Sequence, residues 1–202
     1  MNDRENPMPK ALNVIKDEHR SLGAILHGFL YLVDEIRAGR MQPDFKLLHA
    51  MLYYLENFPE KLHHPKENEF LHHYMRLRSP DAGAILDVVE EEHRQSRAQS
   101  EAMIGALADY EQLGDAHRDT FLDAVKHYAE FQWRHIEREE DQVLPLAIAI
   151  LTPDDWNAID AAFSAHQDPF TSYENIKEFR HLFREIVRLA PPPIGVGPAR
   201  SD

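Results

Sequence analysis

The chain has 202 residues, 13 of them histidine and none cysteine, and 22 Lys and Arg against 35 Asp and Glu give a formal net charge of −13 at pH 7. The lack of cysteine excludes disulfides, thiolate zinc sites, iron–sulfur clusters and cysteine nucleophiles. The acidic balance argues against nucleic-acid binding and against docking on anionic membranes, because both need a basic face. A chain of this length can bury about 70% of its unfolded surface, so one domain with its own core is expected.

The two ends of the chain are expected to be loose tails. Residues 1–10, MNDRENPMPK, are polar and lack the apolar core of a signal peptide. Residues 191–202 are rich in proline and glycine, which neither continue a helix nor bury surface. No apolar run approaches the roughly 18 residues that a membrane-spanning helix needs. We therefore expect a cytoplasmic protein.

Four long helices are predicted between the tails. Apolar residues recur at steps of three and four over residues 12–36, and similar stripes follow over 45–78 and 86–110. A fourth helix is predicted from about 117 to 150. Because the loops between these helices are short, the pattern predicts an all-α fold, an antiparallel up-down-up-down four-helix bundle over residues 11–150.

A smaller helical region is predicted after the bundle. Thr152 and Pro153 are typical of a helix N-cap and first turn. They predict a short helix near 154–163, followed by a longer one near 176–189. We expect residues 151–190 to pack outside the bundle as an appendage.

A weak internal repeat divides the bundle into two hairpins. The segment DEHRSL around His19 resembles EEHRQS around His93, and HPKENEFL around His64 resembles HIEREEDQVL around His135. In the second pair of segments, either His63 or His64 can be aligned with His135. Two hairpins with one pattern predict pseudo-two-fold symmetry and a site at their interface that draws on both.

Two His-x-x-x-Glu pairs have the spacing of a metal site. Residues four apart on a helix share a face, so His63 lies beside Glu67 and His135 beside Glu139. A buried ionised glutamate without a partner costs several kcal/mol. Two of them on core-facing positions therefore indicate bound cations.

Each of the other two helices has one histidine where its apolar stripe requires a core residue. His19 interrupts the stripe of the first helix and His93 that of the third. Together with the two pairs, they bring four imidazoles and two carboxylates from four helices. If both glutamates bridge two ions, as carboxylates can in two-metal sites, each ion has four protein ligands and room for an oxo, hydroxo, water or diatomic ligand.

The assignment within the second helix stays open. His64 is four residues from Asn68, which is a poor ligand, whereas His63 is four residues from Glu67. Pro65 can nevertheless rotate the helix face by one residue, so His64 is an alternative to His63.

A rival motif has the spacing of ferritin-like di-iron bundles, which use Glu-x-x-His on two helices. Glu60 with His63, and Glu90 with His93, have this spacing, but the reading leaves the core histidines of the first and fourth helices without a role. The acidic residues beside His93 and after His135 are expected to be solvated or to orient the imidazoles. The remaining histidines are expected to be surface or structural residues: His27, His49, His72, His73, His117, His127, His166 and His181.

The ordered segments DEHRSL, HHPKENEFL, EEHRQS and HIEREEDQVLP resemble the hemerythrin-like HHE cation-binding domain over roughly residues 11–150. Members of that family are four-helix bundles that hold a non-haem di-iron centre. The resemblance therefore implies two iron ions, bridged by an oxo group or by carboxylates. Carried over position by position, it implies as iron ligands His19, His63, Glu67, His93, His135 and Glu139.

The chain departs from the oxygen-carrying hemerythrins in two places. Those proteins have a His-x-x-x-His pair on the third helix, whereas Arg97 stands four residues after His93 here, and Glu140 stands where they have an aspartate. The resemblance is closer to the branch with two His-x-x-x-Glu motifs. That branch includes proteins linked to iron-centre repair, nitric-oxide response and iron or oxygen sensing.

We therefore expect a protein that binds or senses oxygen, nitric oxide or redox state, with a small diatomic ligand as its partner. One alternative is a di-iron enzyme acting on peroxide or nitric oxide, in which Tyr128 and Gln132, within two turns before His135, supply protons or hydrogen bonds. Two further functions fit the pattern, a factor in iron-centre repair and a bundle whose metal is purely structural.

Overall fold

The computed structural model describes residues 8–164, 184 and 186–188, and every regular element among them is a helix. The fold is therefore all-α, as predicted. Three of the predicted segments fall largely or wholly outside the described residues: the tails at 1–10 and 191–202 and the helix near 176–189.

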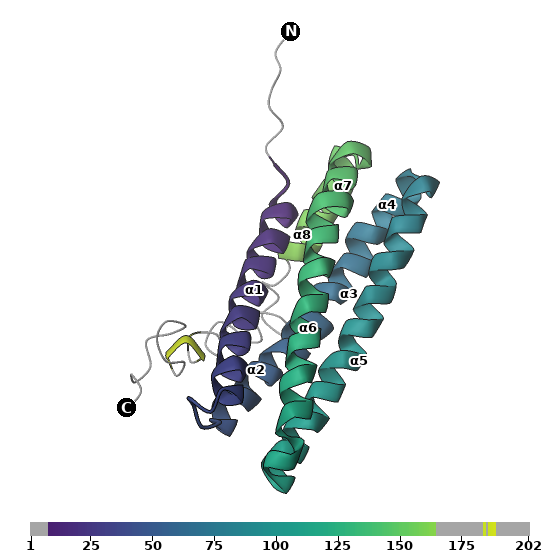
Figure 1. The fold of residues 1–202 in the computed structure, drawn as a ribbon. Coiled ribbons are helices and arrows are strands. Elements are labelled where there is room, and N and C mark those ends of the chain that lie inside the picture. Colours follow the sequence, from purple (N-terminus) through teal and green to yellow (C-terminus); the bar gives the residue numbers. More distant parts are fainter. Residues whose placement is uncertain (1–7, 165–183, 185, 189–202) are drawn as a thin grey trace.

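Four long rods lie side by side, and the chain turns back at each connection (Figure 1). The first rod is α1 (Lys10–Arg37) and the third is α5 (Gly83–Leu113). The second and fourth rods are composite. The second consists of α2 (Phe45–Phe58), the π-helical η1 (Pro59–His63), α3 (His64–Lys66), the π-helical η2 (Glu67–His72) and α4 (His73–Arg78). The fourth consists of α6 (Arg118–Arg138), the π-helical η5 (Glu139–Val143) and α7 (Leu144–Ile150). The short 3-10 turns η3 (Pro80–Ala82) and η4 (Asp115–His117) precede α5 and α6, and α8 (Pro153–Ser164) follows α7.

Local residues explain where the rods begin and end. The Asp44 side chain accepts a hydrogen bond from the Leu47 amide at 3.1 Å and so caps the start of α2. Gly39 after α1 and Gly114 after α5 have φ of 70° and 85°, a conformation that glycine adopts without steric cost. Ser79 is extended because it precedes Pro80, and the second rod ends there.

The described residues form two buried apolar clusters, at opposite ends of the rods. The lower core is drawn from residues 22–36, 47–55, 103–110 and 121–129, with Ile186 packed against them. The upper core is drawn from residues 11–15, 71–75, 82–89 and 143–163. The first and third rods run from the upper core to the lower core, and the second and fourth run from the lower core to the upper core. Successive rods therefore have opposite directions.

Buried polar residues occupy the level between the two cores. In the first rod this level is His19, and in the other rods it lies within residues 60–72, 93–100 and 132–139. Apolar packing on both sides fixes the rods relative to one another. The fold thus holds a polar layer in the middle of the bundle.

Helix α8 closes the upper core. Thr152 and Asp155 form a capping box, in which the Asp155 carboxylate accepts from the Thr152 amide at 2.8 Å and the Thr152 hydroxyl accepts from the Asp155 amide at 3.3 Å. Arg78 donates to the same carboxylate at 2.7 Å. Because Ile159 and Phe163 are fully buried in the upper core, this first helix of the predicted appendage shares the core of the bundle.

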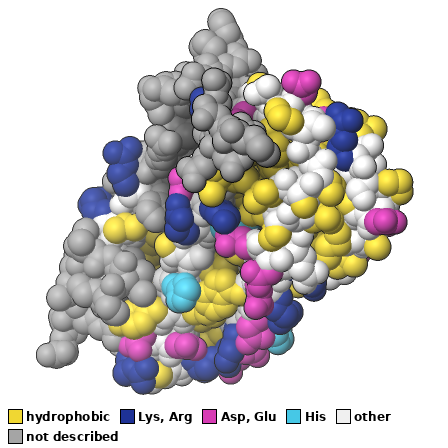
Figure 2. All heavy atoms as spheres, turned by 90° about the horizontal axis from the view of Figure 1, so that it is seen from above, with side chains coloured by type: hydrophobic (Ala, Val, Ile, Leu, Met, Phe, Trp, Pro, Cys, Tyr) yellow, Lys and Arg dark blue, Asp and Glu magenta, His cyan; other side chains and the backbone are white. Residues whose placement is uncertain are grey.

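The surface mixes charge and apolar groups. Seen from above, the molecule shows acidic and basic side chains interspersed with hydrophobic ones (Figure 2). Within the described part of the chain, no helix combines the length and the apolar character needed to cross a membrane.

Candidate metal centre

All six predicted ligands lie in the polar layer. Each exposes at most 5% of its surface. They come from all four rods, as the sequence predicts: His19 from α1, His63 and Glu67 from the second rod, His93 from α5, and His135 and Glu139 from the fourth rod.

The side chains form two groups of potential ligand atoms. In the first group, one atom from each side chain lies within 4.8 Å of the others, and the members are His19, His63, Glu67 and Glu139. In the second group the same holds for His64, His93 and His135.

The two glutamates span both groups. One oxygen of Glu67 lies 3.4 Å from Nε2 of His63, and its other oxygen lies 3.7 Å from Nε2 of His93. Oε2 of Glu139 lies 3.2 Å from Nε2 of His19 and 3.6 Å from Nε2 of His135. Its Oε1 lies 3.4 Å from Nε2 of His93. Each carboxylate therefore lies between imidazoles of both groups.

The inward-facing atoms of the six side chains have no hydrogen-bond partner among the described residues. This is true of Nε2 in all four imidazoles and of both oxygens of Glu67 and Glu139. Leaving buried polar atoms unpaired costs free energy, and the great majority of such atoms in proteins are paired. Imidazole nitrogens and carboxylate oxygens are common metal ligands. The residues thus fit a pair of cations.

The outward nitrogens of the same four imidazoles are held in place. Nδ1 of His19 donates to Glu140 at 2.9 Å, and Nδ1 of His63 donates to Glu18 at 2.7 Å. Nδ1 of His93 donates to Asn68 at 2.9 Å, and Nδ1 of His135 donates to Glu92 at 3.2 Å. All four partners are oxygen acceptors, so Nδ1 carries the proton. In a neutral ring the lone pair is then on Nε2, which faces the interior.

Each acceptor comes from a neighbouring rod and stands next to a predicted ligand in the chain. Glu18 precedes His19, and Glu140 follows Glu139. A ligand and its neighbour in sequence thus serve opposite purposes, because one faces the centre and the other fixes an imidazole of the adjacent rod. The acidic residues beside His93 and after His135 include two of the acceptors, Glu92 and Glu140, as the sequence predicts.

Both His-x-x-x-Glu motifs adjoin π-helical turns. His63 ends η1 and Glu67 begins η2, whereas in the fourth rod His135 lies in α6 and Glu139 begins η5. Pro65 follows η1 by two residues, and Pro145 follows η5 by two residues. A proline lacks the amide that would bond four residues back, and its ring clashes with that carbonyl. A wider turn just before the proline relieves this conflict. Turns of this kind are frequent at functional sites.

The two glutamates differ in their electrostatics. Burial and the negative charge of Glu139 raise the pKa of Glu67 well above its ordinary value. Burial acts in the same direction on Glu139, but contacts with His135, His19 and His93 outweigh it and lower the pKa of this carboxyl well below its ordinary value. In the absence of metal, Glu139 is the ionised member of the pair.

The imidazoles differ in the same way. Burial lowers the pKa of His19, but the neighbouring carboxylates of Glu139 and Glu140 outweigh it and raise the value to about 9. Burial lowers the pKa of His93 to about 4, despite the Glu139 carboxylate 3.4 Å away.

The structure brings further histidines to the site. His64, which sequence reasoning treats as an alternative to His63, is buried together with it, and the two belong to different groups. His72 is also buried, with its ring parallel to that of His93 at a centroid distance of 5.9 Å. The sequence repeat contains a feature that could have singled out both histidines. When His63 is aligned with His135, these two histidines align with Ile136 and Leu144 and so have apolar counterparts.

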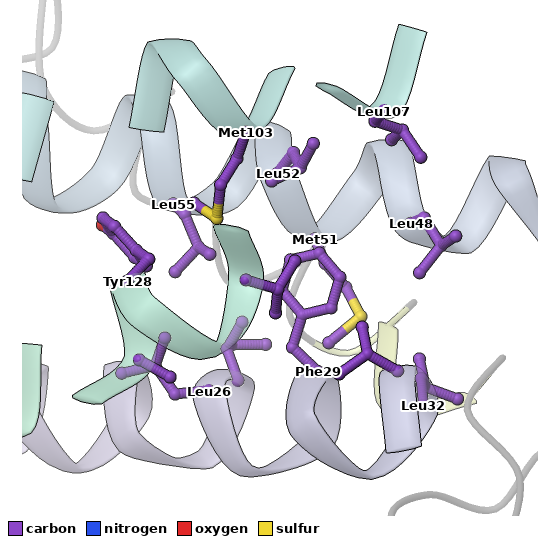
Figure 3. Close-up of a cluster of buried hydrophobic side chains, with 14 of the residues drawn as sticks. Leu26, Phe29, Leu32, Leu48, Met51, Leu52, Leu55, Met103, Leu107 and Tyr128 are labelled. Atoms are coloured by element: carbon purple, nitrogen blue, oxygen red, sulfur yellow. The ribbon is translucent and has the colours of Figure 1, made fainter. Parts of the chain in front are cut away.

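A buried polar network adjoins the second group. Glu60 accepts hydrogen bonds from Ser96 and, at 3.4 Å, from the Tyr128 hydroxyl, and Gln132 donates to Ser96. Tyr128 lies at the edge of the lower core (Figure 3). Burial outweighs these hydrogen bonds and raises the pKa of Glu60 to about 7.

The ferritin-like alternative is not favoured by this arrangement. It requires Glu60 and Glu90 as ligands, but Glu60 bonds Ser96, and Glu90 accepts from Arg76 at 3.0 Å. Neither glutamate belongs to the two groups of potential ligand atoms in the described part of the chain.

Comparison with known proteins identifies one family. The family described as Hemerythrin HHE cation binding domain matches residues 10–147. The match begins with α1 and ends in α7, so it spans all four rods and leaves out α8. No curated protein and no solved structure gives a significant match to the chain.

Proposed function

Because the chain belongs to the hemerythrin HHE cation-binding domain family, we propose that it holds two iron ions between its four rods and binds a diatomic molecule, oxygen or nitric oxide, at them. The protein then acts as a carrier or a sensor. The observation that supports this best is the set of inward-facing imidazole nitrogens and carboxylate oxygens that lack partners among the described residues.

The two groups divide the ligands between the ions. His19 and His63 serve one ion, and His93 and His135 serve the other. Glu67 and Glu139 would hold both ions, since each has oxygens within 3.7 Å of an imidazole nitrogen in both groups.

The choice of iron rests on the family and on the donor set. Imidazole and carboxylate suit iron, and a structural zinc site is usually complete with four ligands. A pair of iron ions supplies reversible redox chemistry and positions for a small ligand. The chain itself supplies apolar packing above and below the polar layer. It also supplies the acceptors that fix each imidazole.

Metal analysis combined with optical spectroscopy tests the proposal. The purified protein should contain two irons per chain, and its spectrum should differ reproducibly under nitrogen, air and nitric oxide. A double variant, His63→Ala with Glu67→Ala, should lose iron and the spectral response but keep its helical circular dichroism. Loss of folding in the double variant would instead indicate a purely structural metal, and a chain that binds no transition metal would overturn the proposal.

A di-iron enzyme acting on peroxide or nitric oxide is the second candidate. The network of Glu60, Ser96, Tyr128 and Gln132 supports it, because such groups can hold or move protons beside the metal pair. Turnover by the loaded protein that exceeds free iron, and that falls in Tyr128→Phe, would favour the enzyme. Turnover no faster than free iron would exclude it.

A further inference from the structure

His64 is a deeply buried histidine with no ordinary means of satisfying its ring. It exposes 2% of its surface, and neither ring nitrogen has a hydrogen-bond partner in the described part of the chain. A core histidine kept for packing alone normally bonds through at least one nitrogen, because an unpaired buried polar atom is costly. The position therefore calls for a ligand that the protein chain does not supply.

The ring of His64 lies against both imidazoles of the second group. It is parallel to the His93 ring at a centroid distance of 4.1 Å and perpendicular to the His135 ring at 5.2 Å. One nitrogen from each of the three rings lies within 4.8 Å of the others. Two nitrogens bound to one ion at metal–nitrogen distances of about 2.1 Å are about 3.0 Å apart when adjacent and about 4.2 Å apart when opposite. An approach of up to about 2 Å would therefore bring all three nitrogens to one ion.

An acceptor is also in place behind this ring. Oε2 of Glu60 lies 3.5 Å from Nδ1 of His64. Ser96 and Tyr128 donate to the other oxygen of the same carboxylate and so fix it. The contact is too long for a hydrogen bond. It nevertheless places a carboxylate oxygen on the Nδ1 side of the ring, as at the other four imidazoles, and leaves Nε2 for a ligand.

The sequence repeat does not supply a matching histidine on the other side. The counterpart of His64 is Ile136, which packs against the lower core. Among the described residues, the side of the centre that contains His19 and His63 therefore has two imidazoles, whereas the opposite side has three.

We propose that His64 is a fifth imidazole ligand of the centre and binds the same ion as His93 and His135. The two ions are then inequivalent, with three imidazoles on one and two on the other. This inference rests on the proposed function, since it requires that the centre holds two metal ions.

The test compares substitutions at His64 with a matched control at His72. His64→Phe keeps a flat ring against His93, and His64→Ala removes the ring. His72→Phe is the control, because His72 is equally buried, is also parallel to His93 and also has unbonded nitrogens, but lies outside the second group. The probe is ferrous iron added without oxygen, in competition with a chelator of known affinity.

We expect both His64 variants to keep one iron at wild-type affinity and to bind the second at least about tenfold to a hundredfold more weakly, a range that loss of a supporting residue alone can cause. Wild type and His72→Phe should hold two irons that give two distinct Mössbauer signals of equal area. Two tightly bound irons with wild-type signals in both His64 variants would overturn the inference about His64 and leave the proposed function standing. A wild-type protein without bound iron would overturn the proposed function as well.

Thermal unfolding separates a ligand from a packing residue. In the metal-free protein, His64→Phe should unfold at the same or a higher temperature than wild type, because it removes two unpaired nitrogens. In the iron-loaded protein the same variant should lose part of the stabilisation that iron gives. An equal fall in both states would assign His64 a structural role and overturn the inference.

Discussion

The two hairpins of the bundle have the same geometry at the centre but differ in charge. In one, Glu140 stands beside the bridging Glu139 and accepts from His19; in the other, Asn68 stands beside the bridging Glu67 and accepts from His93. The distances are the same, 2.9 Å in each case. The acceptor behind the His19 imidazole is therefore anionic, whereas the acceptor behind the His93 imidazole is neutral.

Protonation follows this difference. His19 has a raised pKa and Glu139 a lowered one, whereas His93 has a lowered pKa and Glu67 a raised one. Burial is similar for all four side chains, so the balance of neighbouring charges decides the outcome. A repeat that places side chains alike thus does not make them chemically alike. In the metal-free protein the charge is concentrated on His19 and Glu139, one residue from each hairpin.

Metal removal should have the largest effect on stability. Bound cations require both bridging carboxylates to be ionised and so erase the difference in protonation between Glu67 and Glu139. With free metal in thousandfold excess over its dissociation constant, each ion should stabilise the fold by about 4 kcal/mol. Urea unfolding with and without a chelator measures this. Identical unfolding curves would contradict it.

Substituting the two bridging glutamates in the metal-free protein should have unequal effects. Glu139→Gln removes the carboxylate that faces three imidazoles, and loss of one partner of a buried ion pair typically costs about 3–5 kcal/mol. Glu67→Gln replaces a carboxyl that burial keeps protonated, so it should cost less than about 1 kcal/mol. Urea unfolding at pH 7 compares the two variants, and equal losses would show that both glutamates are ionised.

Glu60→Gln should make the two halves more alike, because Gln132 is the counterpart of Glu60 when His63 is aligned with His135. The folded pKa of Glu60 is about 7 instead of 4.5, so the folded state binds the proton more tightly than the unfolded chain. Its stability contribution is complete below pH 4.5 and is lost as the pH rises to 7, by about 3 kcal/mol in total.

The metal-free variant should therefore gain stability over wild type at pH 8, and the difference should disappear near pH 4. Chemical unfolding across this range measures it. A difference that does not change with pH would show that the pKa of Glu60 is unshifted.

Exchanging the outer acceptors should have the smallest effect. Asn68→Glu places an anion behind His93 and should raise the pKa of that imidazole, with a gain in metal affinity of about tenfold. The reverse change, Glu140→Gln, should lower the pKa of His19. NMR titration of the two imidazoles checks both directions, and unchanged values in either variant would contradict the role of the acceptor charge.

The sequence predicts the helices well because their apolar stripes are long and their ends are marked. The predicted helix near 154–163 is α8 (Pro153–Ser164), with Thr152 at its cap. Its burial against the upper core was less accessible to prediction. Asp160 accepts from the Ala11 amide at 2.8 Å, a contact between residues 149 positions apart that no local pattern encodes.

The six predicted ligands all lie in the polar layer because two patterns fix a core-facing helix face. Spacing by four does so for the two His-x-x-x-Glu pairs, and the apolar stripe does so for His19 and His93. Helix geometry also prevents two adjacent residues from facing the same site, since their side chains point about 100° apart on an α-helix. His63 and His64 therefore compete in a regular helix, and sequence reasoning treats them as alternatives. The π-helical turn η1, which ends at His63, accommodates an extra residue, and both rings turn inward.

The unpaired atoms of the polar layer also have a consequence for the life of the protein in a cell. A chain that has not acquired its cations keeps these atoms desolvated and so unfolds more often than a loaded one. Proteases digest transiently unfolded chains, and a change of about 1–2 kcal/mol is enough to alter abundance several-fold. The amount of this protein should therefore follow the supply of its metal even when its synthesis is constant.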